Sequence, residues 1–596
     1  MPEAVLIPEL AVERGMMKRA KIVATLGPSS SSPEMIRQLI RAGVDVFRLN
    51  FSHGTHGDHA TRIQNIRAIA DEEQRVIGIL QDIQGPKIRI GSVKGGEVIL
   101  KPGTSFFLQS APREADETGA SVSYDNLEKD VPVGAIILMD DGLLELKVTR
   151  PTPEGLHCEV VVGGPLRPNK GVNFPSIKMD VEVLTDKDRE DLLFGIQHKV
   201  DYVAVSFVQE AADMLKVRDF LAHRGSRAHV YAKIERRDAV EAIADIAAVS
   251  DGIMVARGDL GVETTPEEVP LAQKLIIAHC NAVGKPVITA TQMLDSMIHN
   301  PRPTRAEASD VANAIFDGSD AVMLSNETAA GQYPLEAVQT MVRLVLKAEA
   351  SIMSKPRDNR NLADNAPVGD AISLATAQLA DKLRAATIIC ATATGLSARL
   401  VSRHRPRCPI YALTMEHETC RQMTMVWGVV PRVMPRASSD EELIAAAMTD
   451  AQREGFVGDG DIVVVTAGSP VGVPGNTNFI KVEVANTILG RGQGLGKRSI
   501  CGVARLVHSA AEAEAKIQPG DILVAPETTK DFVPAMRRAA GVVVEAGGLT
   551  SHAAIVCLQL GIPLLLEFSN WADLPDGELV TLDPARGIVY NGRAQV

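Results

Sequence analysis

Two short stretches decide how this chain folds: Ala232-Lys233-Ile234-Glu235 and Met254-Val255-Ala256-Arg257-Gly258-Asp259-Leu260-Gly261. Each continues an apolar run and ends in charged residues, which is typical of a buried parallel strand with polar groups at its carboxyl end. About eight such strands around one axis would form a (β/α)8 barrel with its chemistry at the carboxyl ends. Two core strands that end in a surface salt bridge would look the same, so the rest of the chain must decide.

The charged ends of these two stretches predict a particular chemistry. Glu235 and Asp259 would direct two carboxylates at one barrel mouth, enough to hold a divalent cation through oxygen ligands. Lys233 would place a cation beside an oxygen or phosphoryl group that gains charge. Backbone amides at a helix start over 258–265 would favour an anionic, phosphorylated substrate.

The length and net charge of the chain limit its domain number and the kind of partner it binds. With 596 residues the chain is too long for one core, and we expect three or four domains. Lysine and arginine number 62 against 74 aspartate and glutamate, a net charge of −12. This balance argues against nucleic acid as the main partner. An anionic substrate would therefore need a local basic cluster.

Cysteine spacing and hydropathy indicate a cytoplasmic protein. The seven cysteines are scattered without a CxxC pair, which fits reduced thiols and neither a disulfide scaffold nor a zinc site. The N-terminus lacks the apolar core of a signal peptide. No window reaches about 18 consecutive apolar residues, so we expect no membrane span.

Alternating strand and helix patterns along the chain predict the barrel, and one inserted segment interrupts this alternation. We expect eight strands, each with a polar or charged end, over 20–28, 44–50, 76–82, 202–207, 229–235, 251–259, 286–291 and 320–324. Between the third and fourth, 88–170 carries short alternating runs with many glycines and prolines, which predicts an inserted β domain on the catalytic face. The predicted organisation is a leader (1–19), the barrel (20–87 and 171–350), a β lid (88–170), an α/β domain (351–486) and a further segment (487–596).

Three loops beyond the barrel have features of ligand sites. Thr392, Thr394, Gly395 and Ser397 lead into a predicted helix and could form a phosphate nest, although an ordinary turn fits equally. The same two interpretations apply to the Gly/Pro-rich loop over 468–477. The glycines of 491–496 lack a flanking strand–helix unit, so we interpret this stretch as a flexible linker and not a cofactor loop.

One histidine in the last segment also has two interpretations. His552 follows Thr550-Ser551 at a predicted helix start, where partial positive charge would suit a phosphorylated imidazole. The alternative is a helix cap with an exposed histidine.

Residues 18–485 resemble the pyruvate kinase family. The motifs that carry the resemblance match in order and spacing: Phe47-Arg-Leu-Asn-Phe-Ser-His-Gly, Ala232-Lys-Ile-Glu, Met254-Val-Ala-Arg-Gly-Asp-Leu-Gly, Ala290-Thr-Gln-Met-Leu-Asp-Ser-Met and Met323-Leu-Ser-Asn-Glu-Thr-Ala. The family implies a barrel, an inserted β lid, a C-terminal effector domain and usually a homotetramer. The chemistry of the predicted phosphate nest over 392–397 suits a sugar phosphate and AMP about equally. Its reaction transfers a phosphoryl group from phosphoenolpyruvate to ADP.

The resemblance also implies residue roles. Glu235 and Asp259 would hold Mg²⁺ or Mn²⁺, and Lys233 would stabilise the transferred phosphoryl group. Thr291, with Ser325, would deliver the proton, and Arg48 with the Gly258 and Asp259 amides would bind the substrate. The remaining implied residues bind the nucleotide phosphates (Arg89, His53, Lys170) or a monovalent cation (Asn50, Ser52, Asp82).

Two departures from the family pattern carry predictions. Potassium-dependent members typically have threonine and glutamate at the positions of Ile83 and Lys87. We therefore expect the Lys87 ammonium to replace the monovalent cation and potassium not to be required. The last segment lies beyond the common family length and resembles the mobile phosphohistidine domain of phosphoenolpyruvate-utilising enzymes, with His552 at the phosphorylated position.

Two other functions compete with a pyruvate kinase. A dikinase or phosphoenolpyruvate synthase would use His552 as a phosphate carrier, but it needs a separate ATP-binding domain for which the chain has neither a Walker-type loop nor spare residues. A regulatory protein on a kinase scaffold would not need Arg48, Lys233, Glu235, Asp259 and Thr291, all of which are present.

Overall fold

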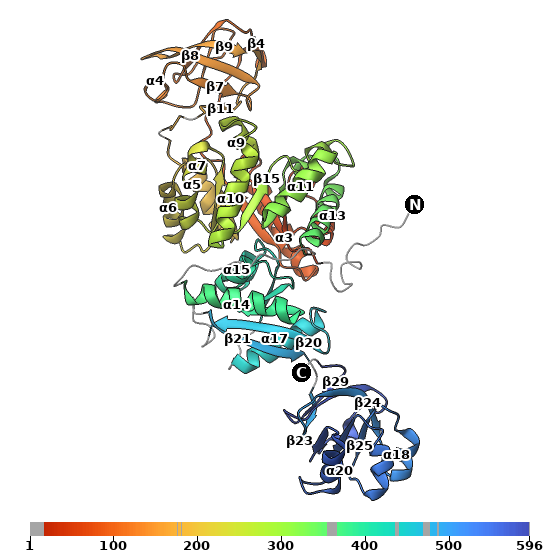
Figure 1. Ribbon diagram of the computed structural model, residues 1–596. Helices are drawn as coiled ribbons and strands as arrows, with labels where there is room; N and C mark the ends of the chain where they lie inside the picture. The colour runs from red at the N-terminus through yellow and green to blue at the C-terminus, as the bar shows by residue number, and fades with distance from the viewer. Residues whose placement is uncertain are drawn as a thin grey trace. The chain divides into compact units, whose positions relative to one another are not determined.

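An eight-stranded parallel barrel forms the centre of the first part of the chain (Figure 1). The computed structural model describes residues 17–175, 177–179, 181–353, 366–434, 440–468, 477–485 and 488–594. The barrel strands are β1 (Lys21–Thr25), β2 (Val46–Asn50), β3 (Gly78–Asp82), β12 (Tyr202–Val205), β13 (His229–Ile234), β14 (Gly252–Ala256), β15 (Val287–Ala290) and β16 (Ala321–Leu324). Parallel pairing of β1 with both β2 and β16 closes the barrel. The predicted α/β barrel is confirmed, with strands a few residues shorter than expected.

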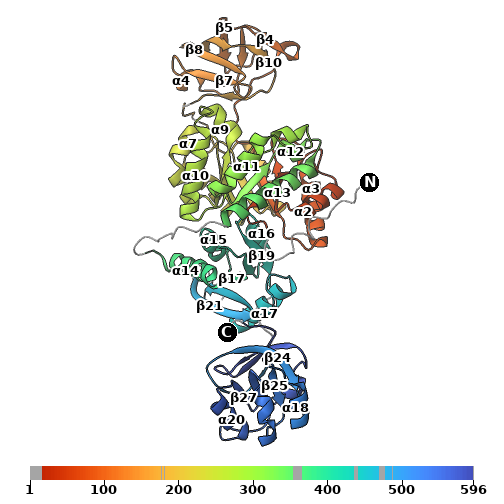
Figure 2. The ribbon, with the colours of Figure 1, turned by 45° about the vertical axis from the view of Figure 1, so that its right-hand side comes forward.

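Helices surround the barrel (Figure 2). Four of them begin at a serine or threonine cap. Thr55, Thr185 and Thr304 each form a capping box with an acidic residue in the first turn, and Ser32 caps the first helix. The helices are α2 (Pro33–Ala42), α3 (His56–Glu72), α5 (Asp186–Gln197), α6 (Ala211–Ala222), α7 (Arg237–Glu241), α8 (Ile243–Val249), α9 (Arg257–Glu263), α10 (Val269–Val283), α11 (Arg305–Asp317), α12 (Asn326–Ala329) and α13 (Pro334–Met353). Within the described residues, no helix is long and apolar enough to cross a membrane.

A small β domain interrupts the barrel between β3 and β12, as predicted. Its six-stranded sheet has the order β11-β7-β8-β9-β5-β6, beside a β10-β4 pair. Its strands are β4 (Val98–Leu100), β5 (Ser105–Gln109), β6 (Gly119–Ser121), β7 (Ile136–Met139), β8 (Leu144–Thr152), β9 (Gly155–Val162), β10 (Gly164–Leu166) and β11 (Val172–Asn173). One helical turn, α4 (Leu127–Asp130), was not expected from the sequence. The domain has a hydrophobic core of its own.

A segment far along the chain closes the amino-terminal end of the barrel. It carries α15 (Leu396–Ser402), α16 (His417–Gln422) and β19 (Val429–Val433). Met425 joins the hydrophobic cluster inside the barrel. The Tyr202 hydroxyl accepts from the Met425 amide at 3.1 Å, and Asp201 pairs with Arg421 at 2.6 Å. Residues 393–405 and 414–433 therefore form one compact unit with the barrel, although the sequence placed them in a separate domain.

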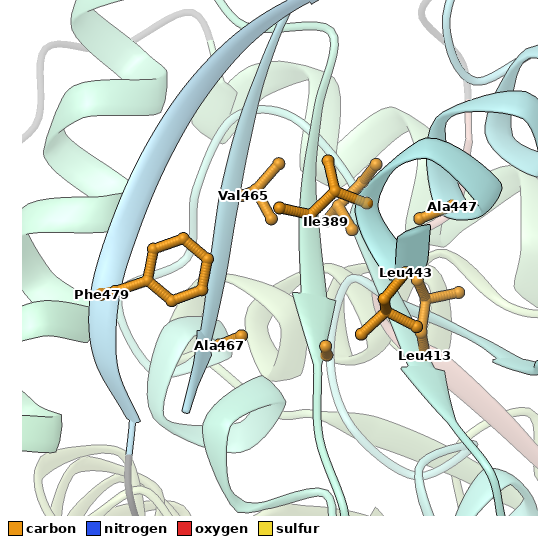
Figure 3. Close-up of a pocket in the computed structure, with 9 residues that line it drawn as sticks. Ile389, Leu413, Leu443, Ala447, Val465, Ala467 and Phe479 are labelled. Carbon is orange, nitrogen blue, oxygen red and sulfur yellow. The ribbon is translucent and has the colours of Figure 1, made fainter. Parts of the chain in front are cut away.

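The α/β region has a sheet in which β17 (Thr387–Ala391) pairs in parallel with β18 (Ile410–Thr414) and β20 (Asp461–Gly468). The antiparallel β21 (Thr477–Ala485) pairs with β20, and the helices are α14 (Val368–Leu383) and α17 (Asp440–Arg453). Apolar runs over 386–390, 409–414 and 461–466 predict three strands, which are confirmed as β17, β18 and β20. Figure 3 shows a small pocket in this region, and its described lining, which includes Ile389, Leu443 and Phe479, is entirely apolar.

The last segment is an α/β fold around an eight-stranded sheet of order β22-β29-β28-β24-β25-β26-β27-β23. The strands are β22 (Ile488–Arg491), β23 (Gln493–Leu495), β24 (Ile500–Leu506), β25 (Ile522–Ala525), β26 (Gly541–Val544), β27 (Leu564–Leu566), β28 (Leu579–Asp583) and β29 (Ile588–Asn591). Its α-helices are α18 (Ala510–Lys516), α19 (Val533–Met536) and α20 (His552–Leu560). Hydrophobic clusters fill both faces of this sheet.

The predicted flexible linker over 491–496 is wrong, because these residues lie largely in β22 and β23. The glycines provide close packing. A Cβ atom on Gly490 would lie 2.1 Å from the Phe568 ring, and one on Gly494 would lie 1.7 Å from the Pro584 carbonyl oxygen. A glycine-rich stretch can indicate flexibility, but here it indicates close packing of the backbone against neighbouring residues.

We predict that Asp201→Ala destabilises the barrel by about 3–5 kcal/mol, because Arg67, Arg421 and the Ile79 amide each lose a hydrogen bond to this buried carboxylate. Trp427 fluorescence during urea unfolding, in a Trp571→Phe background, would measure the change. Lys178→Ala, which breaks an exposed ion pair with Glu210, is the control and should change the free energy of unfolding by less than about 1 kcal/mol. Equal effects of the two changes would contradict the prediction.

Candidate active site

Lys233 forms the centre of a buried charge cluster at the carboxyl ends of β3 and β13. Its Nζ atom lies 2.8 Å from Glu235 Oε1 and 3.3 Å from Asp82 Oδ1. Asp82 also accepts from Arg48 Nε at 2.7 Å. Only 1% of Asp82 and of Glu235 is exposed. The barrel thus brings Arg48 of β2 and Asp82 of β3 together with Lys233 and Glu235 at the end of β13.

The cluster keeps Lys233 charged. Burial disfavours the ammonium, but Asp82 and Glu235 outweigh burial and raise the pKa of Lys233 above its ordinary value. For Asp82, burial opposes ionisation, yet Lys233 and Arg48 lower the pKa. Burial raises the pKa of Glu235 and Asp259 adds to it, while Lys233 opposes both. A cation between the Glu235 and Asp259 carboxylates would offset both the burial of Glu235 and its repulsion by Asp259.

Glu235 and Asp259 are suited to hold a divalent cation. Glu235 follows β13 directly, and Asp259 lies in the first turn of α9. The described residues contain no group of three or more metal-binding side chains, so these two would supply the protein's carboxylates. Mg²⁺ commonly binds one or two carboxylates and completes its shell with water and substrate phosphates. The oxygen donors present therefore fit such an ion.

Thr291 and Gly258 face each other at the start of α9. The Gly258 amide donates to Thr291 Oγ1 at 2.9 Å, and this hydroxyl donates to the Ala290 carbonyl at 2.6 Å. Thr291 has a φ of +67°, which is unusual for a β-branched residue. Arg257 Nη2 fixes the turn by donating to the Thr291 carbonyl at 2.7 Å. The sequence analysis gave Arg257 no role, although it lies inside a quoted motif.

Ser325 provides a free polar group at the end of β16. Its amide donates to Glu327 Oε2 at 2.7 Å. Its hydroxyl is buried and has no hydrogen-bond partner among the described residues. Buried hydroxyls are normally paired, so this one is available to a bound molecule or water.

The proposed monovalent-cation residues lie together, but Lys87 contacts a different carboxylate. Asn50 is in register with Asp82 across β2 and β3, and Asn50 Oδ1 accepts from the Ser52 amide at 3.1 Å. Lys87 Nζ lies 3.4 Å from Asp259 Oδ1. Among the described residues no direct pair joins Lys87 to Asp82. The structure therefore places this ammonium beside the candidate divalent site.

The residues predicted to bind the nucleotide lie on both sides of the lid connection. Arg89 Nη1 donates to the Asn169 carbonyl at 2.9 Å, and Lys170 pairs with Asp140 at 2.7 Å. His53 lies between β2 and α3, where its carbonyl is 3.0 Å from His59 Nε2. Arg89 and Lys170 share the base of the lid, since the Ile90 amide donates to the Lys170 carbonyl at 2.9 Å.

The predicted ligand loops beyond the barrel are only partly described. Gly395, with a φ of +77°, is the N-cap of α15, and Ser397 is buried within that helix. The Thr392 amide donates to the Leu413 carbonyl at 2.9 Å, and the Thr394 carbonyl lies 3.5 Å from Arg399 Nη1. Most of the Gly/Pro-rich loop, 469–476, lies outside the described residues.

His552 lies where the sequence predicted, as the first residue of α20. Ser551 is the N-cap, and its hydroxyl accepts from the Ala554 amide at 3.4 Å. His552 Nδ1 lies 3.2 Å from Thr528 Oγ1. The imidazole is partly exposed.

Comparison with known proteins gives the family. Residues 17–338 match the model "Pyruvate kinase, barrel domain", and residues 370–483 match "Pyruvate kinase, alpha/beta domain". The chain belongs to the pyruvate kinase family. Enzymes of this family use a divalent metal, in agreement with the paired carboxylates. Residues 517–587 match "PEP-utilising enzyme, mobile domain", which agrees with the resemblance found in the last segment.

Similar pyruvate kinases match almost the whole chain. "Pyruvate kinase 2" of Synechocystis sp. is 48% identical over 580 residues, covering 96% of this chain and 98% of that protein. "Pyruvate kinase" of Sporosarcina psychrophila is 46% identical over 585 residues, covering 97% and 100%. The protein of the same name from Geobacillus stearothermophilus is 46% identical over 586 residues, covering 98% and 100%. These pyruvate kinases therefore extend through a last segment as well.

We predict that Lys233→Met lowers kcat by roughly 100-fold or more, because the ammonium acts on charge that develops in the transition state. Steady-state kinetics of pyruvate formation would measure the change, and metal titration should stay nearly normal. Lys178→Met, at an exposed lysine, is the control. Near-normal turnover of the Lys233 variant would remove this residue from the mechanism.

Proposed function

We propose that this chain transfers the phosphoryl group of phosphoenolpyruvate to ADP, which gives pyruvate and ATP, in the last step of glycolysis. The observation that carries the proposal is the buried Lys233 ammonium between Asp82 and Glu235, at the mouth where Asp259 and Thr291 also lie. Phosphoryl transfer depends mainly on positioning and charge neutralisation, and this mouth concentrates both. A cytoplasmic location would fit this reaction.

Each charged group at the mouth has a proposed role. Glu235 and Asp259 would hold Mg²⁺ or Mn²⁺, which supplies a positive charge against the phosphate oxygens when bound. Lys233 would stabilise the phosphoryl group in transfer and the enolate oxygen. Arg48, fixed by Asp82, would bind the substrate phosphate, and the Gly258 and Asp259 amides its carboxylate.

The enol left by phosphoryl transfer must gain a proton to become pyruvate. Thr291 lies beside the Gly258 amide, and Ser325, at the end of β16, has a hydroxyl without a hydrogen-bond partner in the part of the chain that the structure describes. We assign proton delivery to this pair, through water. Ketone formation then pulls the equilibrium toward ATP. Arg89, His53 and Lys170 would bind the nucleotide phosphates.

An assay of the purified full chain tests this function. Phosphoenolpyruvate, ADP and Mg²⁺ should give equal amounts of pyruvate and ATP. Formation of ATP from AMP, with phosphoenolpyruvate and pyrophosphate, would instead favour a dikinase. A folded chain that binds phosphoenolpyruvate but forms no pyruvate would support a regulatory protein.

We also propose a homotetramer regulated by a phosphorylated effector. The family resemblance supports the tetramer. The loop around Thr392, Thr394, Gly395 and Ser397 supports an effector site, and a sugar phosphate and AMP fit its chemistry equally. Kinetics with a panel of phosphorylated metabolites, together with sedimentation analysis, would test both.

We predict that turnover does not require potassium. The Lys87 side chain is only 22% exposed, and its ammonium lies 3.4 Å from Asp259, so its charge is directed into the site and not toward solvent. Ile83 offers no side-chain oxygen to a cation. A monovalent ion beside this ammonium would be repelled. Rates in tetramethylammonium and potassium buffers of equal ionic strength should agree.

Lys87→Glu should create potassium activation, because it removes the fixed cation and adds an oxygen ligand. Lys94→Glu, the same change at an exposed lid lysine, is the control and should stay potassium-independent. Strong potassium activation of the unmodified enzyme would refute the proposal.

The last segment is proposed to be dispensable for the chemistry, because every group assigned a catalytic role lies in the barrel. A chain that ends at residue 487 should fold and form pyruvate. A folded but inactive truncation would make the last segment part of the catalytic machinery. Incubation of the full chain with labelled phosphoenolpyruvate, followed by mass spectrometry, would test His552 as a phosphate carrier. Acid-labile label on His552 would establish the carrier role.

A further inference from the structure

The turn that follows strand β12 forms hydrogen bonds with Lys233 and Glu235, two side chains of the proposed active site. None of the family motifs in the sequence includes this turn. The strand ends at Val205, and the chain turns through Ser206 and Phe207. Ser206 is only 2% exposed. Phe207 has a φ of +57°, a conformation that costs a non-glycine residue roughly 1 kcal/mol. Such a turn persists where surrounding contacts fix it.

The Ser206 hydroxyl links Lys233 to the main chain. Lys233 Nζ donates to Ser206 Oγ at 2.7 Å, and Ser206 Oγ donates to the Ile83 carbonyl at 2.7 Å. Because the Ser206 hydroxyl donates its proton to the Ile83 carbonyl, its oxygen can only accept from the Lys233 ammonium. The direction of this hydrogen bond is therefore fixed.

Ser206 is the neutral member of the three acceptors around Lys233. An ammonium has three N–H donors, and they match Glu235 Oε1 at 2.8 Å, Asp82 Oδ1 at 3.3 Å and Ser206 Oγ at 2.7 Å. A third carboxylate would neutralise more of the charge that must act on the substrate. A hydroxyl orients the ammonium without that loss.

Phe207 fixes the partner of Lys233 from the same turn. Its amide donates to Glu235 Oε2 at 2.7 Å, while Glu235 Oε1 faces Lys233. Strand register explains the position, because β12 pairs with both β3 and β13, which carry Asp82 and Lys233. Two consecutive residues thus hold the lysine and one proposed metal ligand.

We propose that Ser206 is a positioning residue that orients the Lys233 ammonium toward the transferred group, while the Phe207 amide orients Glu235. This inference rests on the proposed function. When substrate oxygens enter, Lys233 must turn away from a carboxylate, and the bond to Ser206 is the one that can remain. Without the Ser206 hydroxyl, the acceptors left to the ammonium among the described residues are the Asp82 and Glu235 carboxylates, which attract it away from the substrate.

The test compares Ser206→Ala with Ser319→Ala in the full chain. Ser319 is a second buried barrel serine, 1% exposed, whose hydroxyl lies 2.7 Å from Thr289 Oγ1 at the opposite end of the barrel. We expect Ser206→Ala to lower kcat by roughly tenfold or more, since small misplacements of a catalytic group are costly. The KM for phosphoenolpyruvate and the metal titration should change by less than about twofold, because they reflect binding and not transition-state charge.

Ser206→Thr should recover most of the lost kcat, because it restores the hydroxyl. Equal kcat for the two alanine variants would overturn the inference, and so would a loss that appears only in KM or in the metal titration. If the threonine does not fit and the protein fails to fold, the two alanine variants still decide. These outcomes can be distinguished from failure of the proposed function, because in that case the unmodified chain would form no pyruvate.

Discussion

Burial of the Lys233 ammonium between Asp82 and Glu235 is the constraint on which the rest of the site depends. Moving such charges out of water costs several kcal/mol each unless they are paired and hydrogen-bonded. Here each carboxylate has a second fixed donor: Arg48 for Asp82 and the Phe207 amide for Glu235. Lys233 and Asp82 are thereby favoured in their charged forms, so their charges act on a substrate at low dielectric.

A barrel is well suited to this requirement because its strand ends are rigid and its register is fixed. β12 connects the two ends of the barrel within four buried residues. At one end Asp201 pairs with Arg421, and at the other Ser206 accepts from Lys233. The segment that closes the amino-terminal end therefore also fixes the strand on which the positions of Lys233 and Glu235 depend.

The sequence predicted the barrel and its charged residues well, because apolar runs with charged ends are local patterns. It did not predict which groups meet. Ser206 and Phe207 lie at the end of a predicted strand but in none of the family motifs, and their roles depend on pairing of β12 with β3 and β13. The contact of Lys87 with Asp259 joins residues 172 positions apart, which no local pattern specifies. The glycines of 491–496 were misread, because close packing and flexibility demand the same residue.

The monovalent and divalent sites are best understood as one electrostatic problem. Asp82, Glu235 and Asp259 place three carboxylates at the mouth, against Arg48, Lys233 and Lys87. Negative phosphate oxygens add charge that these groups must offset. A fixed lysine supplies one positive charge at the cost of side-chain entropy at one position, whereas an ion must be bound from solution. An ammonium beside Asp259 also competes with a divalent cation for the same carboxylate. Strength of divalent binding and independence from potassium should therefore be coupled through the position of Lys87.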